Sequence, residues 1–468
     1  MIADIIPQAA IYNDPGAAST PQQTATYRNL QHLTDAIKTE LLSESPLATK
    51  GKVLEVVGTL VRAVGIDVRV GELCELRSPR GQLLQLAEVV GFARDVALLS
   101  PFGRLVDISR ETQVINLRRP LDVPVGDALL GRVIDCQGQP LDGLGPILCN
   151  TRRPIFADPP NPMTRPLLDT PLYTGVRVVD GLMTLGLGQR MGIFAPAGVG
   201  KSTLMGMFAR GARCDLNVIA LIGERGREVR EFVEQILGPE GMARSVVVCA
   251  TSDRSAIERA KAAYAATAIA EYFRDEGKSV LLMMDSLTRF ARAQREIGLA
   301  AGEPPSQKGY TPSVFAMLPK IFERAGHFKK GSITGFFTVL VEGDDFNEPI
   351  CDAVRGILDG HFILSRELGA AGHYPALDIR HSLSRLTSRV ASPQQLSSIQ
   401  KMREALALYH DSQDLIQLGA YAAGSNPKLD ACIRSRPEIM SFLKQDAHAF
   451  SSFPETLERL EKLAVHLG

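Results

Sequence analysis

A phosphate-binding loop is predicted where a short apolar run leads into glycines, a lysine and a serine. Residues 191–194 are apolar, as a buried strand requires, and Gly198, Gly200, Lys201 and Ser202 follow closely. Glycines allow consecutive backbone N–H groups to point into one concavity and to bind phosphate oxygens. The lysine can reach the β- and γ-phosphates of a nucleotide, and the serine hydroxyl can ligate Mg²⁺. The residues expected to bind the nucleotide here are Ala197, Gly198, Val199, Gly200, Lys201, Ser202 and Thr203.

The usual pattern for such a loop, GxxxxGK[ST], asks for glycine at its first position, where this chain has Ala195. The later positions match, and residues 203–209 are expected to form a helix directly after the loop. A helix N-terminus supplies free N–H groups and a partial positive charge, both of which favour a bound phosphate. Strand, loop and helix in this order favour a phosphate site over a glycine-rich turn that precedes a helix by chance.

Two carboxylates come directly after apolar runs that indicate strands. Asp285 follows the run 280–284, and such a group beside a phosphate loop is expected on the Mg²⁺ side of the site, directly or through a water. Glu224 comes after the run 218–222 and one glycine, and from there a carboxylate can polarise a water for in-line attack on the γ-phosphate. Two simpler roles stay open from the residues alone. Asp285 can cap a following helix, and GERGRE can be a solvated charged turn.

The loop and both carboxylates lie in a central region, 174–385, in which apolar strands alternate with helical segments. This alternation predicts a parallel sheet that is covered on both faces. Ligands of such sheets bind at the carboxyl ends of the strands, which is where the loop, Glu224 and Asp285 are expected. The expected strands are 191–194, 218–222, 246–250, 280–284, 336–341 and 362–364, and the expected helices include 227–237, 256–274 and 312–325.

The flanking regions are predicted to form separate parts. Residues 51–119 contain short β-type runs punctuated by Gly, Pro or Asp, which is typical of a small barrel. Residues 150–173 are expected to form a connecting loop, and the chain after residue 390 is expected to be helical. Residues 27–42 carry an apolar stripe at helical spacing, which fits either a helix packed on its own domain or a docking helix. The expected barrel strands are 53–57, 59–64, 67–70, 73–76, 84–90, 95–99 and 112–117.

The composition restricts the class of protein. The chain of 468 residues has 52 Lys and Arg against 52 Asp and Glu, so no net charge attracts nucleic acid or an anionic membrane. The seven cysteines show no CxxC spacing, which favours reduced thiols over disulfides or a zinc site. The sequence has no run of about 18 apolar residues, so no transmembrane helix is expected. The N-terminus does not resemble a secretion signal.

Several long runs resemble the secretion ATPases of type III systems, which are relatives of flagellar export ATPases and of the catalytic subunits of rotary ATP synthases. The runs are GVGKST, GERGREV, VLLMMDSLTRFARAQREIG, GEPPSQKGYTPSVFAMLPKIFERAG, EGDDFNEPICDAVRGILDGHFILSREL and HYPALDIRHSLSRL. The resemblance covers about residues 50–468. It implies an α/β fold, a RecA-type P-loop core with an N-terminal β-barrel and a C-terminal helical domain. The expected parts are an N-terminal extension at 1–47, the barrel at 48–120, the ATPase domain at 121–388 and the helical domain at 389–468.

The same resemblance assigns further residues to the site. Arg225 matches an arginine near the phosphates, and Arg385 in HSLSRL matches the arginine that enters the site of the neighbouring subunit. Tyr374 in HYPAL matches the tyrosine that stacks on adenine, and Tyr421 in LGAY is expected to close the base pocket from the helical domain. The phosphate, Mg²⁺ and water-activating residues of the family match Lys201, Ser202, Asp285 and Glu224.

The function that the resemblance implies is Mg²⁺-dependent ATP hydrolysis by a homohexameric ring, which powers chaperone release and substrate unfolding for export. The implied partners are a negative regulator or stator protein, a central stalk protein, export-gate components, chaperones and substrates. The implied place is the cytoplasm, peripherally at the inner membrane. The runs TRFARAQ and FKKGSITGFFTVLVEGDD favour the injectisome branch over the flagellar one.

Three alternatives outside this branch are disfavoured. ATP synthase catalytic subunits usually have threonine at the position of Ser202 and an acidic lever segment where this chain has EIMSFLK at 438–444. A hexameric nucleic-acid translocase would need basic, aromatic-bearing loops facing its pore. A non-catalytic subunit of the same fold would normally lack the carboxylate of Glu224.

Overall fold

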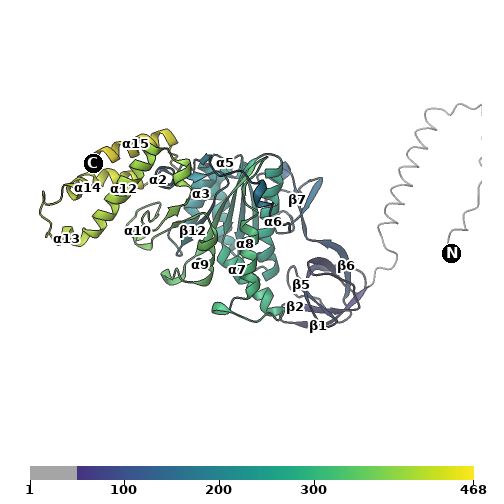
Figure 1. Cartoon of the computed structure of the whole chain (residues 1–468). Coiled ribbons are helices and arrows are strands. Elements are labelled where there is room, and N and C mark those ends of the chain that lie inside the picture. The colour runs from purple at the N-terminus through teal and green to yellow at the C-terminus, as the bar shows by residue number, and fades with distance from the viewer. Residues whose placement is uncertain (1–49, 468) are drawn as a thin grey trace, which may run out of the picture. The chain divides into compact units, whose positions relative to one another are not determined.

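The computed structural model describes residues 50–467 (Figure 1). The helix predicted at 27–42, like the rest of the extension at 1–47, lies outside these residues. Along the described chain, a six-stranded barrel precedes a nucleotide-binding-type α/β core, and helices follow the core. This architecture confirms the predicted fold class.

The first part is a closed antiparallel barrel with the strand order β1-β2-β5-β4-β3-β6. Alternate side chains of a strand point to the same face, and apolar groups such as Val61, Leu76 and Val89 fill the interior of the barrel. The strands are β1 (Gly51–Val57), β2 (Leu60–Val64), β3 (Glu72–Arg77), β4 (Leu83–Ala93), β5 (Val96–Pro101) and β6 (Gln113–Pro120).

One predicted barrel strand, at 67–70, is wrong, because these residues form a turn that leads into β3. The backbone N–H of Arg69 donates to the Glu72 carboxylate at 2.9 Å, and the N–H of Glu72 donates to the Arg69 carbonyl at 3.1 Å. Asn116 of β6 donates its amide to the Asp67 carbonyl at 2.9 Å. These local bonds satisfy backbone groups that a strand would offer to a neighbouring strand.

The second part is a sheet with the order β19-β18-β12-β17-β15-β13-β14-β8, beside which β16 pairs with β17. The strands from β18 to β8 are parallel, as predicted, whereas β19 and β16 are antiparallel to their partners. The strands are β8 (Val133–Ile134), β12 (Arg190–Ala195), β13 (Leu216–Ile222), β14 (Ser245–Ala250), β15 (Ser279–Asp285), β16 (Gly326–His327), β17 (Ser332–Leu340), β18 (Gly360–Ile363) and β19 (Leu383–Ser384).

The two faces of this sheet pack against different helices. Within β13, Val218 and Ala220 belong to one apolar cluster, whereas Ile219 and Leu221 belong to the other, as the two-residue period of a strand requires. Because helices cover both faces of the sheet, the place where a ligand can bind is the edge formed by the carboxyl ends of the strands. The first cluster includes residues of α6 (Ala256–Asp275), α7 (Leu287–Ala300), α8 (Pro312–Phe322) and α9 (Pro349–Ile357), and the second includes residues of α2 (Arg177–Leu182) and α3 (Lys201–Gly211).

The segment at 150–173, predicted to be a loop, contains two short strands. β9 (Thr151–Pro154) pairs with β7 (Asp122–Val125), and β10 (Pro171–Leu172) pairs with β11 (Leu185–Gly186). The helix predicted at 227–237 is also divided. It begins as α4 (Gly226–Glu231) and continues as a π-helical turn over Phe232–Leu237, followed by α5 (Gly238–Ala243).

The third part is helical, as predicted, and a serine side chain caps the start of its first long helix. The Ser392 hydroxyl accepts the N–H of Gln395 at 3.1 Å, which satisfies one of the free donors at a helix start. Its helices are α12 (Pro393–Asp411), α13 (Gln413–Gln417), α14 (Pro427–Leu443) and α15 (Phe453–His466), and the shorter α10 (Arg366–Ala370) and α11 (Thr387–Val390) precede them.

The cysteines and the helices agree with the composition. All seven cysteines carry free thiols, as predicted. Across residues 50–467, no helix is both long and apolar enough to cross a membrane.

A buried ion pair joins the barrel to the core. Lys261 of α6 contacts Glu88 of β4, with 2.6 Å between Nζ and Oε1, and both residues are buried. The ammonium also lies 4.3 Å from the centroid of the Phe156 ring. Burial raises the pKa of Glu88, and its second carboxylate oxygen, Oε2, has no hydrogen-bond partner. Each buried charge is therefore stabilised mainly by the other charge, which replaces the hydration that it would have in water.

Removing one partner of this pair is expected to lower the free energy of unfolding by about 3–5 kcal/mol, because the other charge is left buried and uncompensated. Urea denaturation of Glu88→Leu and Lys261→Met measures this loss. The double variant should recover most of it, since two apolar side chains need no counter-charge. The exposed pair Lys462–Glu458, 2.6 Å apart, is the control and should cost less than about 1 kcal/mol. Equal losses at the two pairs would contradict the prediction.

Candidate nucleotide-binding site

The predicted phosphate loop lies between the carboxyl end of β12 and the start of α3. Gly198 and Gly200 have φ angles of +81° and +86°, which residues with side chains rarely adopt. No atom lies within 4 Å of the place where a Cβ would stand at Gly198, so the loop leaves an open concavity. No side chain caps the N-terminus of α3, which begins at Lys201. The first N–H groups of this helix are therefore available to an anion.

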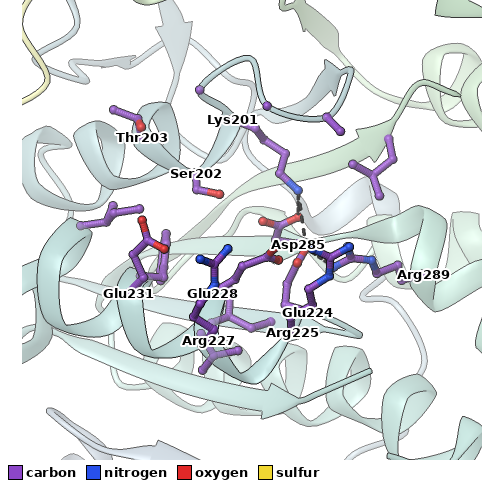
Figure 2. Close-up of a pocket in the computed structure, with 18 of the residues that line it drawn as sticks. Lys201, Ser202, Thr203, Glu224, Arg225, Arg227, Glu228, Glu231, Asp285 and Arg289 are labelled. Atoms are coloured by element: carbon purple, nitrogen blue, oxygen red, sulfur yellow. Dashed lines mark hydrogen bonds and ion pairs between the residues drawn. The ribbon is translucent and has the colours of Figure 1, made fainter. Parts of the chain in front are cut away.

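A cavity of about 450 Å³ opens at this loop, and Figure 2 shows the charged side chains that surround it. Most of the predicted site residues line the cavity, namely Ala197, Gly198, Gly200, Lys201, Ser202, Thr203, Glu224, Arg225 and Asp285. Val199 does not, because its side chain is buried in the apolar core beside α3. Its place in the loop can contribute backbone groups alone. Side chains that the sequence analysis did not assign to the site also line the cavity, among them Arg227, Glu228, Glu231 and Arg289.

A lysine and two carboxylates converge in the cavity (Figure 2). Lys201 Nζ forms an ion pair with Asp285 and lies 3.7 Å from Glu224 Oε1. Asp285 also accepts a hydrogen bond of 2.8 Å from the Thr338 hydroxyl of β17. The three charged side chains are only 3–11% exposed, so little water screens their interactions. Adjacent parallel strands β13 and β15 bring the two carboxylates together.

Among the charged residues that the sequence analysis did not assign to the site, Arg289 contacts a predicted catalytic residue directly. It lies in the first turn of α7 and forms an ion pair with Glu224. Gly223, with a φ of +68°, makes room for it, because a Cβ there would stand 2.9 Å from the Arg289 Cδ. The sequence feature that could have indicated Arg289 is its position four residues after Asp285, at the start of a helix. Only the pairing of β13 with β15 reveals that this turn faces Glu224.

The donor groups at the cavity suit Mg²⁺. Magnesium binds hard oxygen ligands and commonly takes one or two from the protein, with the rest from phosphates and water. The Ser202 hydroxyl and the Asp285 carboxylate supply such oxygens on the same cavity wall. In the described part of the chain, no group of three or more His, Cys, Asp or Glu side chains could hold a metal ion without further ligands. The residues therefore fit a metal that is shared with a nucleotide.

The two predicted base-binding tyrosines lie in different places. Tyr374 lies against the phosphate loop, since a Cβ at Gly200 would stand 3.4 Å from its Cε1, and its ring is partly exposed. The N–H of Gln445 donates to the Tyr374 carbonyl at 2.9 Å. Tyr421 is not among the residues that line the cavity, and its hydroxyl is bonded to the Asn426 carbonyl and to Asp430 in the first turn of α14. The structure thus brings Tyr374 near the site and leaves Tyr421 away from it.

Arg385 also lies away from the cavity of its own chain. It follows β19, in which Ser384 pairs with Gly360, the first residue of β18. The phosphate loop follows the other end of the parallel strands, at Ala195. Six residues of β12 separate the two edges, which is roughly 20 Å. The exposed Arg385 side chain therefore lies across the sheet from Lys201.

The glycine loop, the lysine and two strand-end carboxylates on a mostly parallel sheet define a P-loop nucleotide-binding protein. Family comparisons agree with this class. The ATP synthase alpha/beta family matches with its beta-barrel domain at residues 53–118 and its nucleotide-binding domain at 175–384. The T3SS EscN ATPase C-terminal domain matches residues 391–462.

Individual relatives narrow the class. The type 3 secretion system ATPase of Xanthomonas euvesicatoria is 62% identical over 88% of this chain and 93% of its own length. The flagellum-specific ATP synthase of Bacillus subtilis is 51% identical over 88% and 94%. The assembled ATPase EscN of the enteropathogenic E. coli type III secretion system is 45% identical, with a TM-score of 0.84 over 88% of this chain and 100% of that one. The chain belongs to the type III secretion system ATPases, which are related to flagellar ATPases and to ATP synthase alpha and beta subunits, and it is an ATP hydrolase that binds ATP.

Proposed function

We propose that this chain hydrolyses Mg²⁺-ATP at sites between the subunits of a homohexameric ring, and that the ring releases chaperones from export substrates and unfolds the substrates for secretion. The observation that carries the subunit-interface site is the position of Arg385. The cavity binds phosphate with residues of one sheet edge, whereas Arg385 is exposed at the opposite edge. A head-to-tail contact between copies brings unlike edges together, and repetition of such a contact forms a ring when the rotation between copies closes.

Four charged groups of the cavity have a defined part in this reaction. Lys201, which forms an ion pair with Asp285 in this structure, would bind the β- and γ-phosphate oxygens of the nucleotide. Glu224 accepts a proton from the attacking water or orients it. Arg289 holds the Glu224 carboxylate in place through their ion pair. Magnesium, held by Ser202 and by Asp285 directly or through water, would neutralise charge on the phosphates.

Base recognition and phosphate stabilisation complete the site. Tyr374, partly exposed beside Gly200, is placed to stack on adenine. Arg225 lines the same cavity on the strand-end loop and contributes positive charge near the phosphates. Arg385 of the neighbouring subunit neutralises the charge that spreads over the transferring phosphoryl group.

The proposed partners follow the family. EscN has been solved in complex with its central stalk EscO, and the EscN chain aligns with 88% of this chain. We propose a corresponding stalk protein for this ring, together with a negative regulator or stator, export-gate components, chaperones and substrates. The ring would act in the cytoplasm, peripherally at the inner membrane. No nucleic-acid partner is proposed, in line with the balance of 52 basic and 52 acidic residues.

Steady-state ATPase activity against protein concentration, with mass measured in parallel by light scattering, tests this proposal. Specific activity is expected to rise as hexamers form, because each site takes Arg385 from another chain. A monomer that hydrolyses ATP at a rate independent of concentration would overturn the shared site. Restoration of injectisome secretion in a strain that lacks its own ATPase then tests the export role, and restoration of flagellar export alone would favour the flagellar branch.

A further inference from the structure

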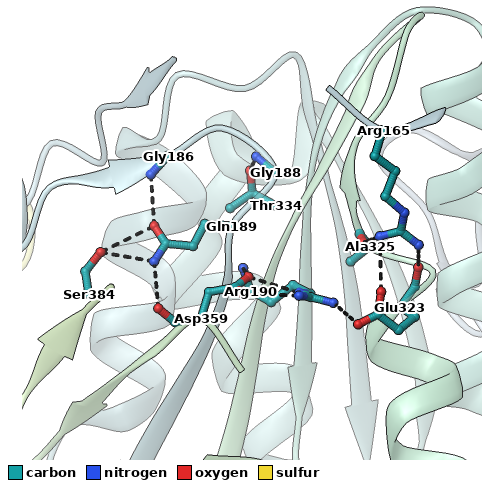
Figure 3. A network of polar contacts seen from close by, with 10 residues as sticks. All are labelled: Arg165, Gly186, Gly188, Gln189, Arg190, Glu323, Ala325, Thr334, Asp359 and Ser384. Atoms are coloured by element: carbon teal, nitrogen blue, oxygen red, sulfur yellow. Dashed lines mark hydrogen bonds and ion pairs between the residues drawn. The ribbon is translucent and has the colours of Figure 1, made fainter. Parts of the chain in front are cut away.

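A buried carboxamide holds the segment that carries Arg385. Gln189 stands directly before β12 and is fully buried. Its Nε2 donates to the Ser384 hydroxyl at 3.0 Å and to the Asp359 carbonyl at 3.2 Å (Figure 3). Its Oε1 accepts the N–H of Gly186 at 2.9 Å. One side chain thus joins the chain before β12 to both β19 and the residue before β18.

The Asp359 carbonyl is shared with the arginine itself. The backbone N–H of Arg385 donates to it at 3.0 Å, so this oxygen accepts both the Gln189 amide and the Arg385 main chain. The Asp359 carboxylate is fixed in turn by Arg190, whose Nε and Nη2 donate at 3.0 and 3.1 Å (Figure 3). Glu323 holds the same guanidinium at 2.5 Å. The carbonyl that accepts the Arg385 N–H therefore belongs to a residue whose side chain is itself held by an ion pair.

The neighbours of Arg385 are anchored on both sides. Ser384 is 5% exposed and Leu386 is 8% exposed, whereas Arg385 between them is exposed. Leu386 packs so closely on Gly186 that a Cβ there would stand 3.0 Å from the leucine Cδ1. Thr387 donates its hydroxyl to the Thr184 carbonyl at 3.2 Å. The main chain is thus fixed around the arginine, and its side chain alone is left free to extend outward.

We propose that Gln189 is a positioning residue for catalysis in the neighbouring subunit, because it fixes the backbone from which Arg385 reaches the phosphates. This inference rests on the proposed function, in which Arg385 acts between subunits. A catalytic group that is displaced by about 1 Å can lose 10²-fold in rate. The hydrogen bonds from Gln189 to Ser384 and Asp359 form a clamp on this backbone. Loss of the Gln189 clamp should therefore lower kcat by about 10- to 100-fold and change the affinity for ATP little.

Gln189 has a second possible role that the experiment must separate from the first. It directly precedes β12, which ends at the phosphate loop, so its loss could act on the P-loop of its own chain. The two roles place the defect on opposite sides of a subunit interface. Mixing variants can therefore distinguish the two roles. A chain that is defective on one side of the interface can still supply an intact other side to its neighbour.

The test compares Gln189→Leu mixed with Glu224→Gln against Gln189→Leu mixed with Arg385→Ala. If Gln189 positions Arg385, mixing with Glu224→Gln should restore activity, since that chain supplies an intact arginine. Random rings would hold about one quarter functional interfaces. Mixing with Arg385→Ala should restore nothing. The reverse pattern, recovery with both partners or recovery with neither would overturn the inference.

Three controls keep the result interpretable. Asn217→Leu removes another fully buried carboxamide, whose Nδ2 bonds to the Ala209 carbonyl and the Ser245 hydroxyl, both at 3.0 Å, away from β19. It should not show the Gln189→Leu mixing pattern. Ser384→Ala removes one partner of the clamp without touching Gln189, and it should show that pattern more weakly. A mixture of Glu224→Gln with Arg385→Ala that shows no recovery would instead count against the shared site itself.

Discussion

Glu224→Gln is expected to bind ATP normally and to hydrolyse it about 10²- to 10⁴-fold more slowly, which is the usual contribution of a positioned general base. Glu224 is 8% exposed and lies at the cavity wall, directly after β13 and Gly223. Glutamine keeps the volume of the side chain but cannot accept a proton from the attacking water. The ion pair with Arg289 is also replaced by a neutral contact. Single-turnover hydrolysis and equilibrium binding of a fluorescent ATP analogue separate the two effects.

Glu231→Gln is the matched control for this prediction. Glu231 lines the same cavity (Figure 2), but it is exposed and is the last residue of α4, the helix that follows Glu224 in the chain. It has no ion pair within residues 50–467. The same chemical change there should alter the rate by less than about threefold. Near-normal turnover in Glu224→Gln, or equal losses in the two variants, would remove Glu224 from the catalytic role.

The centre of the site could be predicted because its signals are local. Gly198 to Ser202 form one continuous motif, and the chain on both sides has the strand and helix that the motif needs. Asp285 and Glu224 could be proposed as site residues because each comes at the end of an apolar run, and parallel strands place such residues at one edge. The barrel could be predicted from its short β-type runs and the Gly, Pro and Asp residues between them, although its register and the turn at 67–70 could not.

The rest of the site depends on which strands are neighbours. Arg289 faces Glu224 only because β15 lies next to β13, and the order along the chain places β14 between them. Gln189 lies 195 residues from Ser384, and nothing in either segment marks the pairing. Tyr421 shows that a local contact can also go unpredicted, since nothing in the sequence indicates that its hydroxyl is bonded to Asn426 and to Asp430 at the start of α14.

Arg385→Ala is expected to reduce kcat by about 10³- to 10⁵-fold, the contribution of an arginine that acts between subunits in phosphoryl transfer. ATP binding should be retained, because in the proposed ring the phosphate loop and Tyr374 that contact the nucleotide belong to the neighbouring subunit. Arg385→Lys should recover little, since an ammonium lacks the planar fork that binds two phosphate oxygens at once. Steady-state kinetics with hexamer content measured in the same samples checks that the loss is catalytic.

Arg380→Ala supplies the control for charge and assembly. Arg380 is another exposed arginine, on the segment between α10 and β19. The carboxylate of Asp378 is 3.9 Å from its guanidinium. Because Arg380 comes before β19, it is not held by the contacts that fix Arg385. Its loss should leave kcat within about threefold of the parent. If both variants lose activity in proportion to lost hexamers, the arginines serve assembly alone. If Arg385→Ala forms full hexamers without hydrolysis while Arg380→Ala stays active, the reaction requires the guanidinium of one subunit at the phosphates of the next.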